Sequence, residues 1–220
     1  MTHRSIHVLA RLAAVTLVVT LTVACTAAPA ASPPPATTGS SVATGGGACP
    51  TAQPEPLAAG ETRTVDIETS QGSIQIKVEA DLSPIAAGNF VTLAGCGYYD
   101  GVVFHRVVPG FVIQGGDPTG TGSGGPGYTI QDEPVTTPYS RGTVAMARTP
   151  APNSVGSQFF IVLDDAARPA LESANTYQII GEVAGGMETV DKIAALPNSG
   201  EPDNAAIDPV VMTDVSVSTP

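Results

Sequence analysis

Histidine is scarce in this 220-residue chain, which contains three. His3 and His7 lie in the N-terminal segment, so His105 is the single histidine in the rest of the sequence. That count excludes a metal site built from several histidines. Cysteine also occurs three times, and its spacing matches neither a zinc signature nor a Cys-x-x-Cys redox motif. We therefore expect no bound metal.

Positive charge is the second scarcity. The chain has nine Lys and Arg against 20 Asp and Glu, and two of the nine, Arg4 and Arg11, lie near the N-terminus. The remaining seven, set against 20 acidic residues, give a net charge of −13 beyond Ala24. A surface this acidic repels the phosphates of nucleic acids and of anionic lipids, so neither is expected as a docking partner. An arginine inside an apolar segment consequently stands out.

Such an arginine occurs in residues 104–117. Most of this segment is apolar, as in a buried strand, yet it contains Arg106. A guanidinium keeps its charge, and burying it without a partner is very costly. Arg106 is therefore predicted to face an apolar cleft, with Gln114 brought beside it by the intervening Pro-Gly turn. The alternative is a structural ion pair between Arg106 and a buried acid such as Asp117.

Residues 1–24 have the features of an export signal. The two N-terminal arginines supply positive charge, and a run of apolar and small residues ends directly before Cys25. This pattern resembles a bacterial lipoprotein signal, although Thr22 stands where such signals usually carry leucine. We expect export and a lipid on Cys25 that anchors the protein to the cell membrane, facing outside the cytoplasm. The alternative is an ordinary cleaved secretory signal.

Residues 25–60 are predicted to form a disordered linker. They are rich in Ala, Pro, Thr, Ser and Gly and hold almost no large apolar side chain, so they cannot bury enough surface to fold. Such a tether holds a domain away from a membrane. Export places the two other cysteines in an oxidising compartment. We expect a disulfide between Cys49 and Cys96 that fastens the end of the linker to the domain, with two unpaired thiols as the alternative.

Residues 61–218 are predicted to form the folded domain. Ser83 followed by Pro84 predicts the start of a helix, and a second helix is expected at about 187–196. Alternating or apolar segments predict eight strands, at 64–68, 74–78, 102–107, 111–114, 142–147, 159–163, 177–183 and 210–217. This pattern favours a mainly β fold, a closed eight-stranded antiparallel β-barrel capped by two α-helices. A closed barrel exposes no sheet edge, which suits a monomer.

Several short motifs, taken in order, resemble the cyclophilins, the barrel-fold peptidyl-prolyl cis-trans isomerases. One Phe-His-Arg alone is weak evidence, but the whole set occurs in the family's order and close to its spacing. The matching motifs are Asn89-Phe90, Gly97-Tyr98-Tyr99-Asp100-Gly101, Phe104-His105-Arg106-Val107-Val108-Pro109-Gly110-Phe111, Gln114-Gly115-Gly116-Asp117, Gly142-Thr143-Val144-Ala145-Met146-Ala147, Gly156-Ser157-Gln158-Phe159-Phe160-Ile161 and Gly181-Glu182-Val183. The resemblance implies a cyclophilin-like barrel that isomerises X-Pro bonds in proline-containing polypeptides.

Position by position, the resemblance implies that Arg106 and Gln114 are catalytic. It also implies a set of substrate-binding residues: His105, Phe111, Val112, Ala147, Arg148, Thr149, Gln158, Phe160, Leu171 and Tyr177. Three features depart from the family. Val112 replaces a common methionine, residues 146–158 are about one residue longer, and the chain has no tryptophan. A tryptophan helps animal cyclophilins bind cyclosporin, so inhibition by that drug is not expected.

Isomerisation needs residue types of this kind. Rotation about an X-Pro bond has a barrier of about 18–20 kcal/mol because twisting breaks the resonance of the amide. A fixed guanidinium aimed at the prolyl nitrogen stabilises the twisted state more than either planar state. No bond is made, so we expect no nucleophile, metal or cofactor. The alternative function is a non-catalytic module that binds proline-containing segments.

Two further patterns point to other chemistry. His105 and Ser157 are residue types of a hydrolase triad, but the sequence around Ser157 lacks the nucleophile-elbow pattern. The glycine-rich residues 120–127 are of the composition that cradles phosphate, but the Gly-Lys-Ser/Thr ending is missing. A hydrolase is therefore not expected, and residues 120–127 are predicted to form a surface loop.

Overall fold

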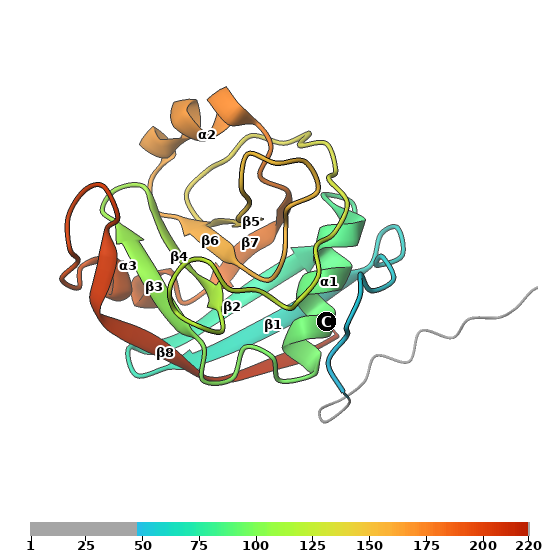
Figure 1. Ribbon diagram of the computed structural model, residues 1–220, viewed down its shortest axis with the longest axis horizontal. Helices are drawn as coiled ribbons and strands as arrows, with labels where there is room; N and C mark the ends of the chain where they lie inside the picture. The colour runs from blue at the N-terminus through green and yellow to red at the C-terminus, as the bar shows by residue number, and fades with distance from the viewer. Residues whose placement is uncertain (1–47, 220) are drawn as a thin grey trace, which may run out of the picture. The chain divides into compact units, whose positions relative to one another are not determined.

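The computed structural model describes residues 48–219, and the eight strands of this part of the chain close into one antiparallel barrel (Figure 1). Around the barrel the strands follow the order β1-β2-β7-β5-β6-β4-β3-β8. The predicted closed eight-stranded barrel is therefore confirmed. The strands are β1 (Thr62–Thr69), β2 (Gly72–Glu79), β3 (Val103–Val108), β4 (Val112–Asp117), β5 (Thr143–Met146), β6 (Phe159–Val162), β7 (Ile179–Gly185) and β8 (Ala205–Ser218).

The hairpin of β1 and β2 shows how the sequence pattern sets the register. Val65 lies opposite Ile76 and Ile67 lies opposite Ile74, and all four side chains are buried in the barrel. Burying an aliphatic side chain of this size stabilises the fold by about 1.5–3 kcal/mol relative to leaving it exposed. A slip by one residue turns all four to the solvent, so alternative registers are strongly disfavoured.

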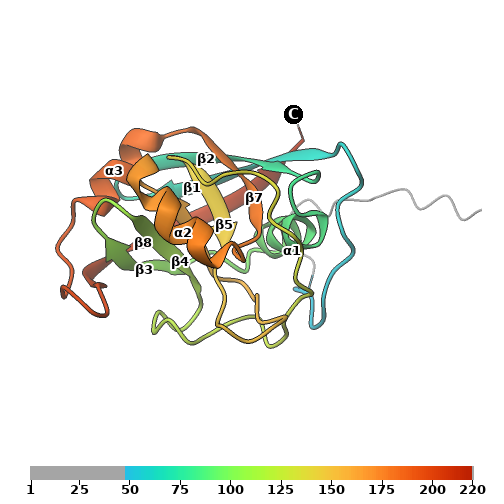
Figure 2. The same cartoon turned by 90° about the horizontal axis from the view of Figure 1, so that it is seen from above.

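Between residues 48 and 219, three α-helices accompany the barrel, one more than the two that the sequence predicts. α1 (Pro84–Gly95) and α3 (Met187–Ala194) are the predicted pair, and they lie on opposite sides of the barrel (Figure 1 and Figure 2). α2 (Arg168–Ala174) is the additional helix, and it follows a single 3-10 turn. Of its residues only Leu171 is buried. One buried residue gives no apolar periodicity, which is why the sequence pattern did not reveal this helix.

The start of α1 is capped by a distant residue. Ser83 occupies the N-cap position, but its side chain makes no capping hydrogen bond. The carboxylate of Glu133 instead accepts hydrogen bonds from the backbone amides of Ile85 and Ala86, each at 2.9 Å. A carboxylate at a helix N-terminus pairs otherwise unsatisfied amides and interacts favourably with the helix dipole. The contact fastens the long loop between β4 and β5 to α1.

Residues 48–60, the last part of the predicted disordered linker, lie along α1. The amide of Leu57 donates to the carbonyl oxygen of Pro84 at 3.1 Å, and the Leu57 side chain packs against the core. Gly88 permits this approach, because a β-carbon there would lie 2.5 Å from the carbonyl oxygen of Glu55. The predicted linker therefore extends too far. Composition alone does not reveal these contacts, which hold the segment in place.

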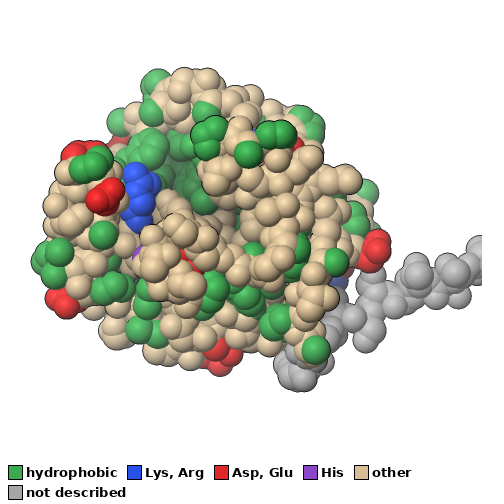
Figure 3. All heavy atoms as spheres, viewed as in Figure 1, with side chains coloured by type: hydrophobic (Ala, Val, Ile, Leu, Met, Phe, Trp, Pro, Cys, Tyr) green, Lys and Arg blue, Asp and Glu red, His purple; other side chains and the backbone are tan. Residues whose placement is uncertain are grey.

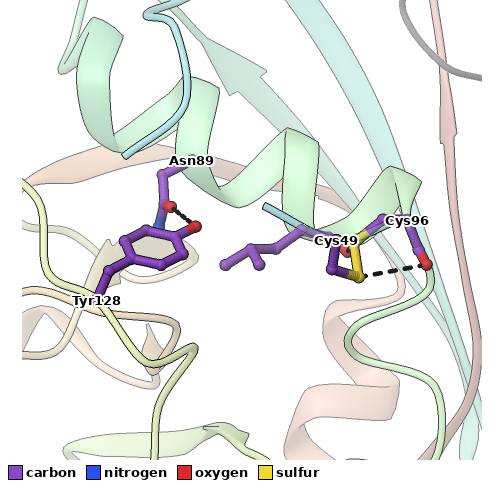
Figure 4. The surroundings of a disulfide bond; sticks show 5 residues. Cys49, Asn89, Cys96 and Tyr128 are labelled. Carbon is purple, nitrogen blue, oxygen red and sulfur yellow. Dashed lines mark hydrogen bonds between the residues drawn. A yellow bond between two sulfur atoms is a disulfide. The ribbon is translucent and has the colours of Figure 1, made fainter. Parts of the chain in front are cut away.

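A disulfide joins Cys49 to Cys96, the residue that follows α1 (Figure 4). The two α-carbons are 5.3 Å apart, within the usual range for a disulfide. On the same helix, the side chain of Asn89 accepts a hydrogen bond from the hydroxyl of Tyr128 at 2.8 Å (Figure 4). It also donates to the carbonyl oxygen of Gly156 at 2.8 Å. The N-terminal segment and two loops are thus all fastened to α1.

The predictions for the N-terminus concern residues outside this description. The export signal at residues 1–24, the lipid on Cys25 and residues 25–47 of the linker fall there, and they stay predictions. Among residues 48–219, no helix has the length and apolarity needed to cross a bilayer.

Replacing both Cys49 and Cys96 by serine is expected to lower the free energy of unfolding by about 2–4 kcal/mol, because the bond closes a long loop in the unfolded chain. Denaturant unfolding followed by circular dichroism measures the change. Each single substitution should cause about the same loss as the double one. An unfolding midpoint that is insensitive both to the double substitution and to a reducing agent contradicts a stabilising role for the bond.

Candidate functional site

Strands β3 and β4 bring the two predicted catalytic residues together. Arg106 on β3 lies directly opposite Gln114 on β4. The chain reverses between them at Gly110, whose φ of +69° is in the left-handed region that favours glycine. The pairing of β3 with β4 and with β8 shifts register between Phe104 and Arg106, so His105 is a bulge residue. The bulge leaves Phe104 and His105 both buried while Arg106 is partly exposed.

Within the described part of the chain, the Arg106 guanidinium has only neutral partners. Its Nη1 donates to Oε1 of Gln114 at 3.4 Å, and its Nε donates to the backbone carbonyl oxygen of Asp203 at 3.2 Å. Each of the other four arginines in residues 48–219 has a carboxylate within 4.0 Å: Arg63, Arg141, Arg148 and Arg168. The alternative of an ion pair between Arg106 and Asp117 is therefore wrong. Arg106 keeps an uncompensated positive charge.

A cavity of about 210 Å³ lies beside this guanidinium. It is lined by nine of the twelve predicted site residues: Arg106, Phe111, Val112, Gln114, Ala147, Arg148, Phe160, Leu171 and Tyr177. Phe160 and Leu171 are almost fully buried, and the ring of Tyr177 meets the ring of Phe160 edge-on, with 5.3 Å between centroids. Figure 3 shows a hollow lined by hydrophobic side chains with a basic side chain at its edge. The site is an apolar cavity with one positively charged side chain at its rim.

The side-chain amide of Gln114 is oriented by Gln158. Its Nε2 donates to Oε1 of Gln158 at 2.9 Å, and Nε2 of Gln158 donates to the carbonyl oxygens of Gly122 and Gly124 at 3.0 and 2.9 Å. Because both ends of the Gln158 amide are occupied, its orientation is fixed. That orientation in turn leaves Oε1 of Gln114 free to face Arg106. Gln158 lines a separate cavity of about 400 Å³, between residues 122–129 and residues 147–158, rather than the apolar one.

The glycine-rich loop is organised around the carboxylate of Asp117. This buried carboxylate accepts hydrogen bonds from the amides of Thr119, Thr121, Gly122 and Gly124, at 2.6–3.1 Å. Burial on its own raises the pKa of Asp117, but the hydrogen bonds outweigh it and hold the pKa well below its usual value. The loop amides point at a carboxylate of the protein itself. The phosphate-cradle reading therefore has no support.

The side chain of Arg148 does not face the apolar cavity as a free charge. It is 9% exposed and pairs with Asp132 at 3.0 Å, while it donates to the carbonyl oxygens of Thr149 and Ala151 at 3.1 and 2.7 Å. It thereby clamps residues 148–151 within the segment 146–158, which the family resemblance implies to be about one residue longer than in animal cyclophilins. Ala147 and Arg148 still line the edge of the apolar cavity. Thr149 lines the cavity that Gln158 also lines.

His105 is buried, at 6% exposure, and neither ring nitrogen has a hydrogen-bond partner. Burial lowers the pKa of His105, which keeps the imidazole neutral at neutral pH. The Ser157 hydroxyl is also fully buried, and it donates to the carbonyl oxygen of Gly116 at 2.7 Å. His105 and Ser157 form no hydrogen bond with each other, so the hydrolase triad is not formed. No pattern in the sequence indicated a role for Asp203. Its backbone carbonyl, in the segment before β8, orients Arg106.

A closed eight-stranded barrel with an apolar cavity edged by an arginine is the architecture of the cyclophilins. The family described as cyclophilin type peptidyl-prolyl cis-trans isomerase matches residues 64–217. The peptidyl-prolyl cis-trans isomerase ppi1 of Schizosaccharomyces pombe is 43% identical over 136 residues, 60% of this chain and 85% of that protein. A peptidyl-prolyl cis-trans isomerase-like 2 of Cryptococcus neoformans is 41% identical, and the match spans 58% of this chain but only 22% of that longer protein.

Solved structures agree with these sequence matches. A Cryptosporidium parvum cyclophilin type peptidyl-prolyl cis-trans isomerase superposes with a TM-score of 0.65 at 34% identity, over 72% of this chain and 99% of that one. The same protein, crystallised in the presence of the dipeptide Ala-Pro, superposes with a TM-score of 0.64. The chain therefore belongs to the cyclophilin-type peptidyl-prolyl cis-trans isomerase family.

Asp117→Asn is expected to lower the free energy of unfolding at neutral pH by about 1–3 kcal/mol, because an amide nitrogen would face backbone amides. In the wild type the folded-state pKa of Asp117 is depressed, so its contribution is present above pH 4 and is lost as the pH falls below that value. Unfolding measured from pH 7 to pH 2 should show a shallower acid loss in the variant. Asp208→Asn, which removes an exposed carboxylate, is the control. Parallel pH profiles for wild type and Asp117→Asn contradict the assignment.

Proposed function

We propose that the chain catalyses cis-trans isomerisation of X-Pro bonds by electrostatic stabilisation of the twisted amide. The observation that carries the proposal is the Arg106 guanidinium, which lies at the edge of an apolar cavity and has no carboxylate of residues 48–219 within 4.0 Å. An arginine with a structural ion-pair partner has little charge left to act on a ligand. Arg106 is free to do so.

The twisted state differs from the planar states at one atom. When the amide twists, the prolyl nitrogen regains its lone pair and becomes a hydrogen-bond acceptor. A guanidinium N–H directed at that nitrogen gains a charge-assisted hydrogen bond in the twisted state that neither planar isomer offers. Interactions that are stronger in the transition state than in the ground state are those that accelerate a reaction.

The remaining residues position the peptide. Val112, Phe160 and Leu171 form an apolar surface that suits a proline ring, with Phe111 and Tyr177 at its rim. Holding the ring still lets the preceding residue rotate. Gln114, fixed by Gln158, offers its amide to the carbonyl side of the bond. The relative from Cryptosporidium parvum that was crystallised in the presence of Ala-Pro supports a ligand of this class.

A non-catalytic module that binds proline-containing segments is the second candidate. The same cavity supports it, because ring binding by Val112, Phe160 and Leu171 needs no guanidinium. The two functions separate at Arg106, which contributes to turnover in the first and adds little in the second.

Arg106→Ala is expected to lower kcat/KM for a short X-Pro peptide about 10²–10³-fold, as for loss of a single preorganised electrostatic donor. Exchange spectroscopy by NMR measures the isomerisation rate without a coupling protease. Arg106→Lys should recover only part of the activity, because an ammonium lacks the planar fork of donors. Equal rates for wild type and Arg106→Ala leave the binding module as the function. Melting temperatures within a few degrees of wild type show that the variants are folded.

We further propose that the protein is exported and held at the cell membrane, facing outside the cytoplasm, by a lipid on Cys25. The charged N-terminus, the apolar run and the position of Cys25 support this, as does the Cys49–Cys96 disulfide, which suits an oxidising compartment. A single acyl chain binds a membrane only weakly, and stable anchoring usually takes a second chain or a basic patch. A diacylated N-terminal cysteine supplies two chains at one residue. The domain is proposed to act there as a monomer on proline-containing segments of exported or surface proteins.

Full-length protein expressed in a bacterium is expected to enter the detergent-rich phase on phase separation, and Cys25→Ser is expected to remain in the aqueous phase. Intact mass should show the added acyl mass on wild type alone. Cys49→Ser keeps the N-terminal cysteine and serves as the control. Aqueous partitioning of wild type with an unmodified Cys25 overturns the anchor proposal.

A further inference from the structure

A second cavity, of about 400 Å³, adjoins the apolar cavity across Arg106 and Gln114. These two side chains line both cavities. The other residues around the second cavity are His105, Gly120, Thr121, Gly122, Pro202, Asp203 and Ala205. None of the apolar residues of the first cavity takes part. The two cavities therefore meet at the pair of groups proposed to act on the X-Pro bond itself.

Asp203 is the one acidic residue among those that line the second cavity, and Arg106 is the one basic residue. The Asp203 side chain is exposed, and its carboxylate takes part in none of the ion pairs formed by residues 48–219. The contact with Arg106 uses the backbone carbonyl of Asp203 and leaves the carboxylate unpaired. Acidic side chains lie beside the basic side chain on the side away from the hydrophobic hollow (Figure 3). A cation on the side of this cavity away from the Arg106 guanidinium can pair with this carboxylate.

The imidazole of His105 forms a second polar wall of this cavity. It is more than nine-tenths buried, and both ring nitrogens lack hydrogen-bond partners. The ring lies close to Gly122, where an added β-carbon would be 3.8 Å from Nε2. Buried polar atoms without partners are uncommon in folded proteins. A neutral imidazole does not repel a cation and accepts a hydrogen bond through its unprotonated nitrogen.

We propose that this cavity is the subsite for the side chain of the residue before proline and that it favours Lys or Arg there, an inference that rests on the proposed isomerase function. In that mechanism Arg106 faces the prolyl nitrogen and Gln114 the carbonyl of the preceding residue. The side chain of that residue is then next to the wall that the two cavities share. Its ammonium or guanidinium pairs with the carboxylate of Asp203.

The charge of the whole domain acts in the same direction. Beyond Ala24 the chain has seven basic and 20 acidic residues, and five of the seven basic residues are already paired with carboxylates. The resulting negative field attracts basic peptides generally. The experiment must therefore separate this general attraction from a contact at Asp203.

The test uses peptides that differ only in the residue before proline, which is Ala, Lys or Glu, with kcat/KM measured by NMR exchange. We expect Lys to exceed Ala about two- to fivefold, the range for one exposed ion pair, and Glu to fall below Ala. A fourth peptide keeps Ala before proline and carries Lys several residues away. It reports the general attraction and should lie close to the Ala peptide in 0.5 M salt, where long-range interactions are screened.

Asp203→Asn is expected to bring the ratio of Lys to Ala peptides to about one. Asp208→Asn makes the same change in net charge at an exposed position outside the cavity and should keep the ratio. Equal values for Lys and Ala peptides in the wild type, or a preference that survives Asp203→Asn, overturns the subsite. Absence of acceleration for every peptide instead overturns the proposed function. If the Ala peptide is isomerised but the Lys peptide is not preferred, the subsite is overturned and the proposed function stands.

Discussion

An arginine that brings its charge to the edge of an apolar cavity, with no carboxylate to neutralise it, is the constraint on which the rest of the molecule depends. A guanidinium cannot lose its proton, so it must be oriented by neutral groups if its charge is to remain available. The structure meets this need with two carbonyl-type oxygens, one on Gln114 and one on the backbone of Asp203. Pairing with a carboxylate gives firmer orientation, but it removes the charge that the proposed chemistry uses.

The surrounding structure fixes those neutral partners through a continuous set of hydrogen bonds. The buried carboxylate of Asp117 gathers the amides of the glycine-rich loop, and carbonyl oxygens of that loop hold Gln158. Gln158 then holds Gln114, which faces Arg106. The negative charge of Asp117 thus lies near the site, but it is hydrogen-bonded to backbone amides and does not pair with the guanidinium. Groups positioned in advance in this way need little reorganisation when a reaction occurs.

Much of this arrangement can be predicted from the sequence, for reasons that differ between elements. Alternating apolar residues set the register of β1 and β2, and the scarcity of basic residues makes Arg106 conspicuous. The cap of α1 by Glu133 and the contact between Arg106 and Asp203 join residues far apart in the chain, and no local pattern encodes them. Helix α2 is too short to show a periodicity. The packing of residues 48–60 on α1 depends on one close approach at Gly88, which composition does not report.

The central claim is that charge, rather than the shape of the arginine side chain, lowers the barrier. Replacing Arg106 by citrulline tests it most directly, because citrulline keeps the planar group, the length and three of the five N–H donors, while it loses the charge and exchanges one terminal nitrogen for a carbonyl oxygen. The account predicts that the NMR exchange rate of a bound Ala-Pro peptide falls at least tenfold while its dissociation constant changes by less than twofold. An exchange rate equal to that of wild type would contradict it.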